Sequence, residues 1–189
     1  YPFGENSFLH IDMYHQYAPF FMEFQRKLKA HESLMFSWNL GLGSDFVATF
    51  AYYLASPVNW LVVFCSKQHL IEFMTVLVLL KIACSGLFFA IYLGRHFKDN
   101  SYLVTLVSMF YALSAYISAY SWNIMWLDCI FLLPLILYGL EQLVQEKKGL
   151  FYCVTLGLSI LSNYYISIMI CIFMVMYVIM QVILNPPKG

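Results

Sequence analysis

The sequence predicts an all-α, polytopic helical membrane protein with a long first extracytoplasmic loop that contains interfacial helices. Of the 189 residues, 62% are hydrophobic and 11% are charged, whereas an ordinary soluble domain has about 25% charged residues. Apolar runs of bilayer length, with few charges, alternate with short polar segments after residue 67. We therefore divide the chain into a first loop, 1–67, and a membrane part, 68–189, with helices over 70–94, 102–120, 127–144, 149–162 and 164–184.

Charge and cysteine usage exclude two classes of protein. The formal net charge is zero and no run is rich in lysine or arginine, so nucleic acid is not expected as a partner. The five cysteines are scattered, mostly in apolar runs, which is typical of packing residues and not of a disulfide framework. Because the sequence starts at Tyr1 and stops just after an apolar run, we expect it to be a piece of a longer protein.

The opening segment, 1–17, concentrates polar side chains in a chain that is otherwise poor in them. It carries Asp12, His10, His15 and three tyrosines. His10 and His15 are five residues apart and do not share a helical face, which argues against a two-histidine metal site on a helix. The concentration of polar groups beside a membrane predicts a functional site.

An amphipathic helix is predicted over 14–32, where aromatic residues recur at helical spacing between charged ones. Two interpretations of its cations stay open: a helix lying flat at the headgroup level, which the pattern favours, and a phosphate-binding role for Arg26 and Lys27. After it, Asn39, Gly41 and Gly43 predict a tight turn.

Residues 46–66 contain no charge and are long enough to cross a bilayer. Against a single span stands Ser56-Pro57, since serine can cap a helix and proline can open one. We favour two short helices that lie on or dip into the membrane. If the run crosses instead, Asp12 moves to the cytoplasmic side.

Two charges fall in or beside the predicted spans. Lys81 is the single interior charge of 70–94, near the expected depth of the bilayer centre, where an ammonium is costly and should face a polar partner; a functional and a purely structural role both stay open. Asp128 is the only charge between Asp99 and Glu141, and helix capping is its structural alternative.

The last two spans are less regular. Pro134 is expected to kink the helix over 127–144. Residues 162–165 divide the following apolar run into two spans, of which the first is short, so an interfacial segment followed by one span remains an alternative.

Alternating spans place the basic residues that follow them on one side, and the positive-inside bias makes that side cytoplasmic. These residues are Arg95, Lys98, Lys147, Lys148 and Lys188. The extracytoplasmic side then holds Asp12, Asp45, Asp128, Asn163, Tyr164 and Tyr165. The first loop also contains Arg26, Lys27 and Lys29, which the positive-inside bias would place on the cytoplasmic side. A long loop, however, constrains the topology less than a short one.

The order of these features resembles the bacterial YfhO membrane proteins. The similar segments are Tyr1-Pro2-Phe3-Gly4, Asp12 with Gln16-Tyr17, residues 39–43, Tyr52-Tyr53-Leu54-Ala55-Ser56-Pro57 with Asn59, Trp126-Leu127-Asp128 followed by Leu133-Pro134-Leu135, and Ser162-Asn163-Tyr164-Tyr165. YfhO proteins resemble GT-C glycosyltransferases, which take a sugar from a polyprenyl-phosphate donor and act on the outer face. The resemblance therefore implies a multi-pass enzyme of the bacterial cell membrane that decorates a cell-envelope polymer such as lipoteichoic acid.

By the same resemblance the first loop carries an essential acidic residue, and Asp12 is the position that matches. Sugar transfer needs a group that takes or orients the proton of the acceptor hydroxyl, and a carboxylate can do either. We expect Asp12 in this role, with Asp128 as a second carboxylate that orients the acceptor or a metal.

The departing phosphate must be neutralised by a cation, a metal or protein donors. The candidates are Lys81, His10 and His15, and a divalent metal could serve the same purpose. Gln16, Trp126, Asn163, Tyr164 and Tyr165 complete the expected substrate-binding set, although interface anchoring is the commoner use of such aromatic residues.

Two other classes of function stay open. A transporter or flippase of a lipid-linked substrate would use Lys81 as its intramembrane charge and would be favoured by inverted repeats, of which the sequence shows none that is convincing. A non-catalytic membrane scaffold would keep its function when Asp12 and Asp128 become asparagine.

Overall fold

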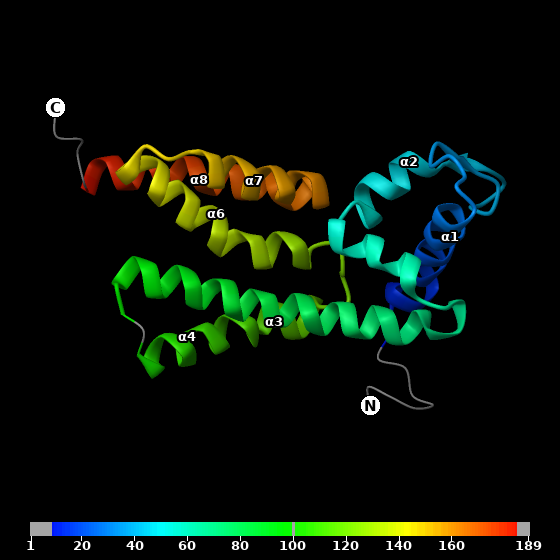
Figure 1. The fold of residues 1–189 in the computed structure, drawn as a ribbon, viewed down its shortest axis with the longest axis horizontal. Coiled ribbons are helices and arrows are strands. Elements are labelled where there is room, and N and C mark those ends of the chain that lie inside the picture. Colours follow the sequence, from blue (N-terminus) through cyan, green and yellow to red (C-terminus); the bar gives the residue numbers. More distant parts are fainter. Residues whose placement is uncertain (1–8, 100, 185–189) are drawn as a thin grey trace.

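The computed structural model describes residues 9–99 and 101–184, which are almost entirely helical (Figure 1). The predicted all-α, polytopic class is confirmed. The Tyr1–Gly4 motif and Lys188 lie outside the described residues. The elements, in chain order, are η1 (Met13–Tyr17), α1 (Ala18–Lys29), β1 (Phe36–Ser37), β2 (Ser44–Asp45), α2 (Phe46–Thr49), η2 (Phe50–Leu54), η3 (Pro57–Phe64), η4 (Lys67–His69), α3 (Leu70–Phe97), α4 (Tyr102–Ala112), α5 (Ala115–Tyr120), α6 (Leu127–Glu146), α7 (Leu150–Ser162) and α8 (Tyr164–Leu184).

Within the described part of the chain, four helical stretches are long and apolar enough to cross a membrane. They are Lys67–Phe97, Tyr102–Tyr120, Leu127–Glu146 and Tyr164–Ile183. The second is interrupted between α4 and α5, where Ser114 caps α5. Helix α7 is apolar but has 13 residues, about 20 Å at 1.5 Å per residue, which is less than the roughly 30 Å of a hydrocarbon core.

Helices α3, α4, α6, α7 and α8 run alongside one another as a bundle, and the elements of the first loop gather at one end of it (Figure 1). Small residues allow two close helix contacts. A Cβ added to Gly86 of α3 would lie 3.1 Å from the Cβ of Ala112 in α4. A Cβ added to Gly139 of α6 would lie 2.8 Å from backbone atoms of Tyr152 in α7. These glycines let the helix backbones approach to a distance that a side chain would prevent.

Pro134 lies inside α6 and cannot bond the carbonyl of Ile130 one turn earlier, because proline has no N–H. The hydroxyl of Tyr111 in α4 donates to this Ile130 carbonyl at 2.7 Å. A backbone group left free by proline is thus satisfied by a neighbouring helix, as an apolar environment requires.

The first loop has an apolar core of its own that continues into α3. Phe21, Phe24 and Phe46 are fully buried and belong to one cluster with Leu70 and Met74 of α3. The loop therefore packs on the N-terminal part of α3 and is not a separate unit.

A charged network holds the 30–39 segment onto α1. Arg26 binds Glu23 at 2.8 Å and Glu32 at 2.6 Å, and Lys27, only 3% exposed, donates to the carbonyls of Ser33 and Phe36. Hydrogen bonds from Arg26 lower the pKa of Glu23 to about 2, in spite of its partial burial. Arg26 and Lys27 are thus bound within the loop. Neither cation is left unpaired for a phosphate, which argues against the phosphate-binding alternative.

The uncharged run over 46–66 forms two bent segments. Phe46–Leu54 and Pro57–Phe64 meet at 105°, with the break at Ser56-Pro57 as expected from proline at a helix start. Both segments lie at the same end of the bundle as α1 (Figure 1).

Candidate functional site

A buried ion pair joins the first loop to the bundle. Lys81 Nζ of α3 lies 2.5 Å from Asp128 Oδ2 of α6, and each side chain is 1% exposed. Ser56 Oγ donates to the other oxygen of Asp128 at 2.6 Å. Lys81 also donates to the Ile124 carbonyl at 3.1 Å and faces Asn59 Oδ1 at 3.5 Å. All three protons of the ammonium and both oxygens of the carboxylate therefore have protein partners.

The pair lies at one end of the bundle and not midway along it. Asp128 is in the first turn of α6, whereas Lys81 lies about 16 Å from the start of α3 at about 1.5 Å per residue. The N-terminal part of α3 extends beyond α6 and carries the first loop (Figure 1). Lys81 is therefore level with the first turn of α6, and the expectation that it lies near the depth of the bilayer centre stays a prediction.

Asp12 lies at the start of η1, at the end of the bundle that carries the first loop, and is partly exposed. Among the described residues no cation pairs with it, and its side chain makes no capping hydrogen bond. It is near Tyr17 and Tyr53, since its charge contributes to raising the pKa of both hydroxyls. Gln16, one helical turn after Asp12, donates through Nε2 to the Tyr53 hydroxyl at 3.2 Å. Asp12 and Gln16 therefore both lie near Tyr53.

Tyr17 connects this segment to the turn before α6. Its hydroxyl donates to Asn123 Oδ1 at 3.0 Å. Burial, with the Asp12 carboxylate as a second cause, raises the pKa of Tyr17 above its ordinary value, and the phenol therefore remains a donor at neutral pH.

A row of aromatic rings leads from Tyr17 to the start of α8. The ring centroid of Tyr53 lies 5.5 Å from that of Tyr17 and 4.7 Å from that of Tyr52, and Tyr52 lies 5.8 Å from Tyr164. Asn163 Nδ2 donates to the Tyr52 carbonyl at 3.2 Å. The sequence segments expected to share a site, Asp12 with Gln16 and Asn163 with Tyr164, are thus linked through two tyrosines of η2.

The turn before α6 contains two buried N–H donors without an acceptor in the described structure. They are Asn123 Nδ2 and Trp126 Nε1. Such a donor costs about 1–3 kcal/mol when it stays unpaired. Asn123 already holds Tyr17 through its oxygen, so its free amide group lies next to the Asp12 segment.

The remaining predicted residues lie at the surface or outside this row. His10 is exposed, and His15, also exposed, lies with its ring centroid 5.4 Å from that of Tyr14 in an edge contact. Tyr164 and Tyr165 are about half exposed, at 50% and 46%. The two tyrosines at the start of α8 are therefore accessible to a ligand, while Asp128 and Lys81 are not.

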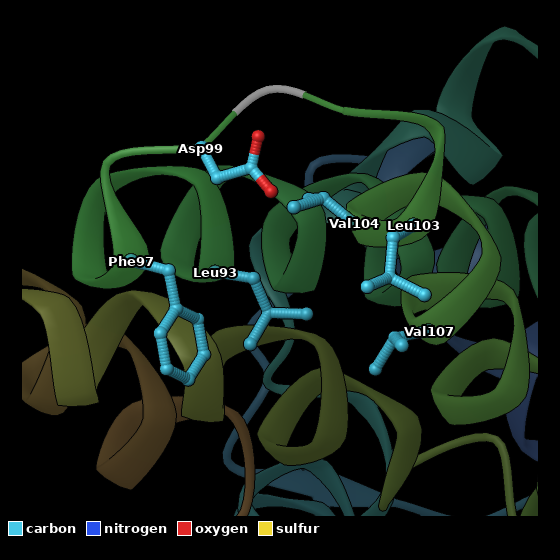
Figure 2. A pocket seen from close by; sticks show the side chains of 6 residues that line it. All are labelled: Leu93, Phe97, Asp99, Leu103, Val104 and Val107. Atoms are coloured by element: carbon cyan, nitrogen blue, oxygen red, sulfur yellow. The ribbon is translucent and has the colours of Figure 1, made fainter.

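Residues 9–99 and 101–184 contain no group of three or more histidine, cysteine, aspartate or glutamate side chains that could hold a metal ion. A cavity of about 360 Å³ lies far from Asp12, between the C-terminal end of α3 and the start of α4. Figure 2 shows its lining, which is apolar except for Asp99. The Asp99 carboxylate accepts hydrogen bonds from Ser101, so the described lining of this cavity has no polar side chain that is free to bind a ligand.

A family model described as bacterial membrane protein YfhO matches residues 1–188. The chain belongs to the YfhO family. No curated protein and no solved structure matches it. Membership identifies a bacterial multi-pass membrane protein, in agreement with its apolar helices.

Sequence reasoning missed four residues that organise the site of this YfhO chain: Tyr17, Tyr53, Asn123 and Ser56. Tyr17 and Tyr53 were quoted only as parts of motifs, because a tyrosine in an aromatic-rich segment is usually an interface residue. Asn123 lies between two tryptophans, and that polar interruption is the signal that could have identified it. Ser56 was interpreted as a helix cap, yet its hydroxyl binds Asp128.

Proposed function

We propose that the protein is an integral membrane glycosyltransferase that moves a sugar from a polyprenyl-phosphate donor to a cell-envelope polymer, such as lipoteichoic acid, on the outer face. The observation that carries the proposal is the Asp12 carboxylate. It is partly exposed, has no cationic partner among the described residues, and lies beside a row of tyrosines that ends at accessible rings of α8. The resemblance of YfhO proteins to GT-C enzymes supports the same reaction.

Asp12 takes or orients the proton of the acceptor hydroxyl. A carboxylate suits this role when no cation neutralises it. Tyr53 and Gln16 hold the segment around Asp12. Tyr164, Tyr165 and Trp126 offer aromatic faces to sugar rings.

The departing phosphate requires donors that a ligand can reach. Lys81 is fully used by Asp128, Ile124 and Asn59 and has no proton left for a ligand. The N–H groups of Asn123 and Trp126 have no partner among the described residues, but they are buried as Lys81 is and do not face a ligand in this conformation. His10 and His15 remain candidates for the same phosphate.

Asp128 is then a positioning residue. Its carboxylate holds Ser56 of the first loop and Lys81 of α3, and so fixes the loop against the bundle end. Asn163 also holds the first loop against the bundle, because its amide donates to the Tyr52 carbonyl.

The alternative of a transporter or flippase loses its main support, because the lysine that would serve as its intramembrane charge is paired and lies at the bundle end. The outer location of the Asp12 end rests on the basic residues at the opposite ends of α3 and α6. An impermeant thiol reagent on intact cells tests it in full-length protein without native cysteines: Leu42→Cys, a position 99% exposed, should react, and Lys148→Cys should not.

The test of the reaction is Asp12→Asn in the full-length protein, with Asp45→Asn as the matched control. Asp45 is also an exposed acid of the first loop, but it caps α2 through Val47, and asparagine keeps this cap. At equal protein abundance we expect Asp12→Asn to reduce sugar transfer to the envelope polymer in membranes by about 100-fold or more and Asp45→Asn to leave it unchanged. Unchanged transfer in Asp12→Asn would favour the scaffold alternative.

A further inference from the structure

A second polar site lies at the end of the bundle away from Asp12. A cavity of about 350 Å³ opens between the C-terminal ends of α3 and α6. It is lined by Arg95, Lys98, Tyr138, Glu141, Gln142, Gln145 and Glu146. Unlike the groove of Figure 2, its lining is predominantly polar.

The two carboxylates of the cavity already have partners. Glu141, 7% exposed, accepts hydrogen bonds at a single oxygen from Tyr177 at 2.6 Å and Tyr92 at 3.1 Å, and bonds His96 Nδ1 at 2.8 Å. Glu146 pairs with Lys148 at 2.7 Å. Neither carboxylate forms an ion pair with Arg95 or Lys98, and both keep their negative charge in the lining.

The two cations of the cavity are unpaired. No carboxylate of the described residues lies within ion-pair distance of Arg95 or Lys98. Arg95 donates one N–H to the Tyr138 hydroxyl at 3.2 Å, and its guanidinium carbon lies 5.7 Å from the centre of that ring. Gln142 donates to the same hydroxyl at 3.0 Å. The arginine is thus held by α6 while most of its N–H groups stay free for a ligand.

The position of the cavity selects the ligand. Helix α6 has 20 residues, about 30 Å at 1.5 Å per residue, which equals the thickness of a hydrocarbon core. The cavity lies along its last turns and beside the last residues of α3, at the level of lipid headgroups. The lining holds two cations and two carboxylates, but the cations form no ion pair with them, and unpaired cations between helices at this level suit the phosphate of an anionic lipid. A fixed guanidinium can donate two parallel N–H groups to phosphate oxygens.

We propose that this cavity binds the phosphate of an anionic membrane phospholipid through Arg95 and Lys98. Arg95 supplies directed donors and Lys98 a second, mobile charge. Gln142 and Gln145 are available for the hydroxyls or esters around the phosphate.

The test uses the full-length protein, purified in neutral detergent, with thermal unfolding followed as phosphatidylglycerol is added. We expect phosphatidylglycerol to raise Tm, phosphatidylcholine to have a much smaller effect, and Arg95→Gln/Lys98→Gln to raise the half-saturating phosphatidylglycerol fraction about tenfold or more. The matched control, Lys29→Gln/Lys67→Gln, removes two cations at the opposite end of the bundle and should keep the response. Lys98→Gln alone, at an exposed position, should give a smaller shift and covers the case in which the double variant does not fold.

Two outcomes would overturn the proposal. If phosphatidylglycerol raises the Tm of Arg95→Gln/Lys98→Gln and of Lys98→Gln at the same lipid fraction as in the wild type, the lipid acts elsewhere. An equal rise in Tm with inorganic phosphate at the same concentration would show that the site takes a soluble phosphate and not a lipid.

Discussion

Removing the charge of Lys81 should strongly destabilise the protein. In Lys81→Met the Asp128 carboxylate stays 1% exposed and keeps the hydrogen bond from Ser56, but it loses its counter-ion. Breaking one partner of a buried ion pair costs about 3–5 kcal/mol, because an uncompensated charge remains. The Ile124 carbonyl also loses a donor, which adds to the cost.

A double variant separates the pair from its surroundings. In Lys81→Met/Asp128→Asn no charge remains, and the asparagine oxygen can still accept from Ser56. We expect the double variant to recover about 2 kcal/mol or more relative to Lys81→Met, because removing both charges abolishes the main penalty. The measurement is a denaturant titration of the purified full-length protein in micelles, followed by tryptophan fluorescence.

The same variants distinguish positioning from chemistry at Asp128. If Asp128 only fixes the first loop, the double variant should regain sugar transfer together with stability. Transfer that stays absent at restored stability would place Asp128 in contact with the substrate. A Lys81→Met protein within about 0.5 kcal/mol of wild type, the range of ordinary surface substitutions, would refute the structural reasoning itself.

Three further predictions concern the scaffold. Gly139→Ala should lower the free energy of unfolding by about 1–3 kcal/mol, because its Cβ would meet the backbone of α7 at 2.8 Å, while Gly157→Ala, with no atom within 4 Å, should be neutral or stabilising; equal effects of the two would contradict the close contact. Tyr111→Phe should cost about 1–3 kcal/mol in the same titration, because the α6 carbonyl left free by proline loses its donor, and a loss below 0.5 kcal/mol would argue against this bond. Since the pKa of Glu23 is lowered from 4.5 to about 2, the stability that it contributes is complete above pH 4.5 and is lost as pH falls toward 2. Stability measured between pH 6 and 2.5 should therefore decline less in Glu23→Gln than in wild type, and parallel curves would contradict the assignment.

The membrane class and the order of the helices could be predicted because bilayer thickness requires apolar runs of defined length, and these runs are visible without any tertiary information. The break at Ser56-Pro57 was equally visible, since proline imposes it locally. In both cases the cause lies within the segment that it shapes.

The position of Lys81 beside the first turn of α6 could not be predicted in this way. Hydropathy shows where an apolar run begins and ends, but the part of α3 that carries the first loop is also apolar, with Glu72 as the one charge between Leu70 and Leu80. The pairing of Lys81 with Asp128 depends on where α6 begins relative to α3, which is a property of packing. For the same reason the contact of Tyr17 with Asn123, 106 residues later in the chain, left no signal in either segment.

The ion pair also implies an order of assembly during synthesis. Lys81 emerges 47 residues before its partner, which corresponds to about 2–10 s at 5–20 residues per second. During this interval α3 carries an uncompensated charge that costs about 2.5–3.5 kcal/mol at the centre of a helix entering the membrane and less near its end. The first loop, made earliest, lacks the carboxylate to which Ser56 binds until α6 begins. The loop that carries Asp12 thus acquires its contacts with Asn123 and Asp128 only after the later part of the chain has been made.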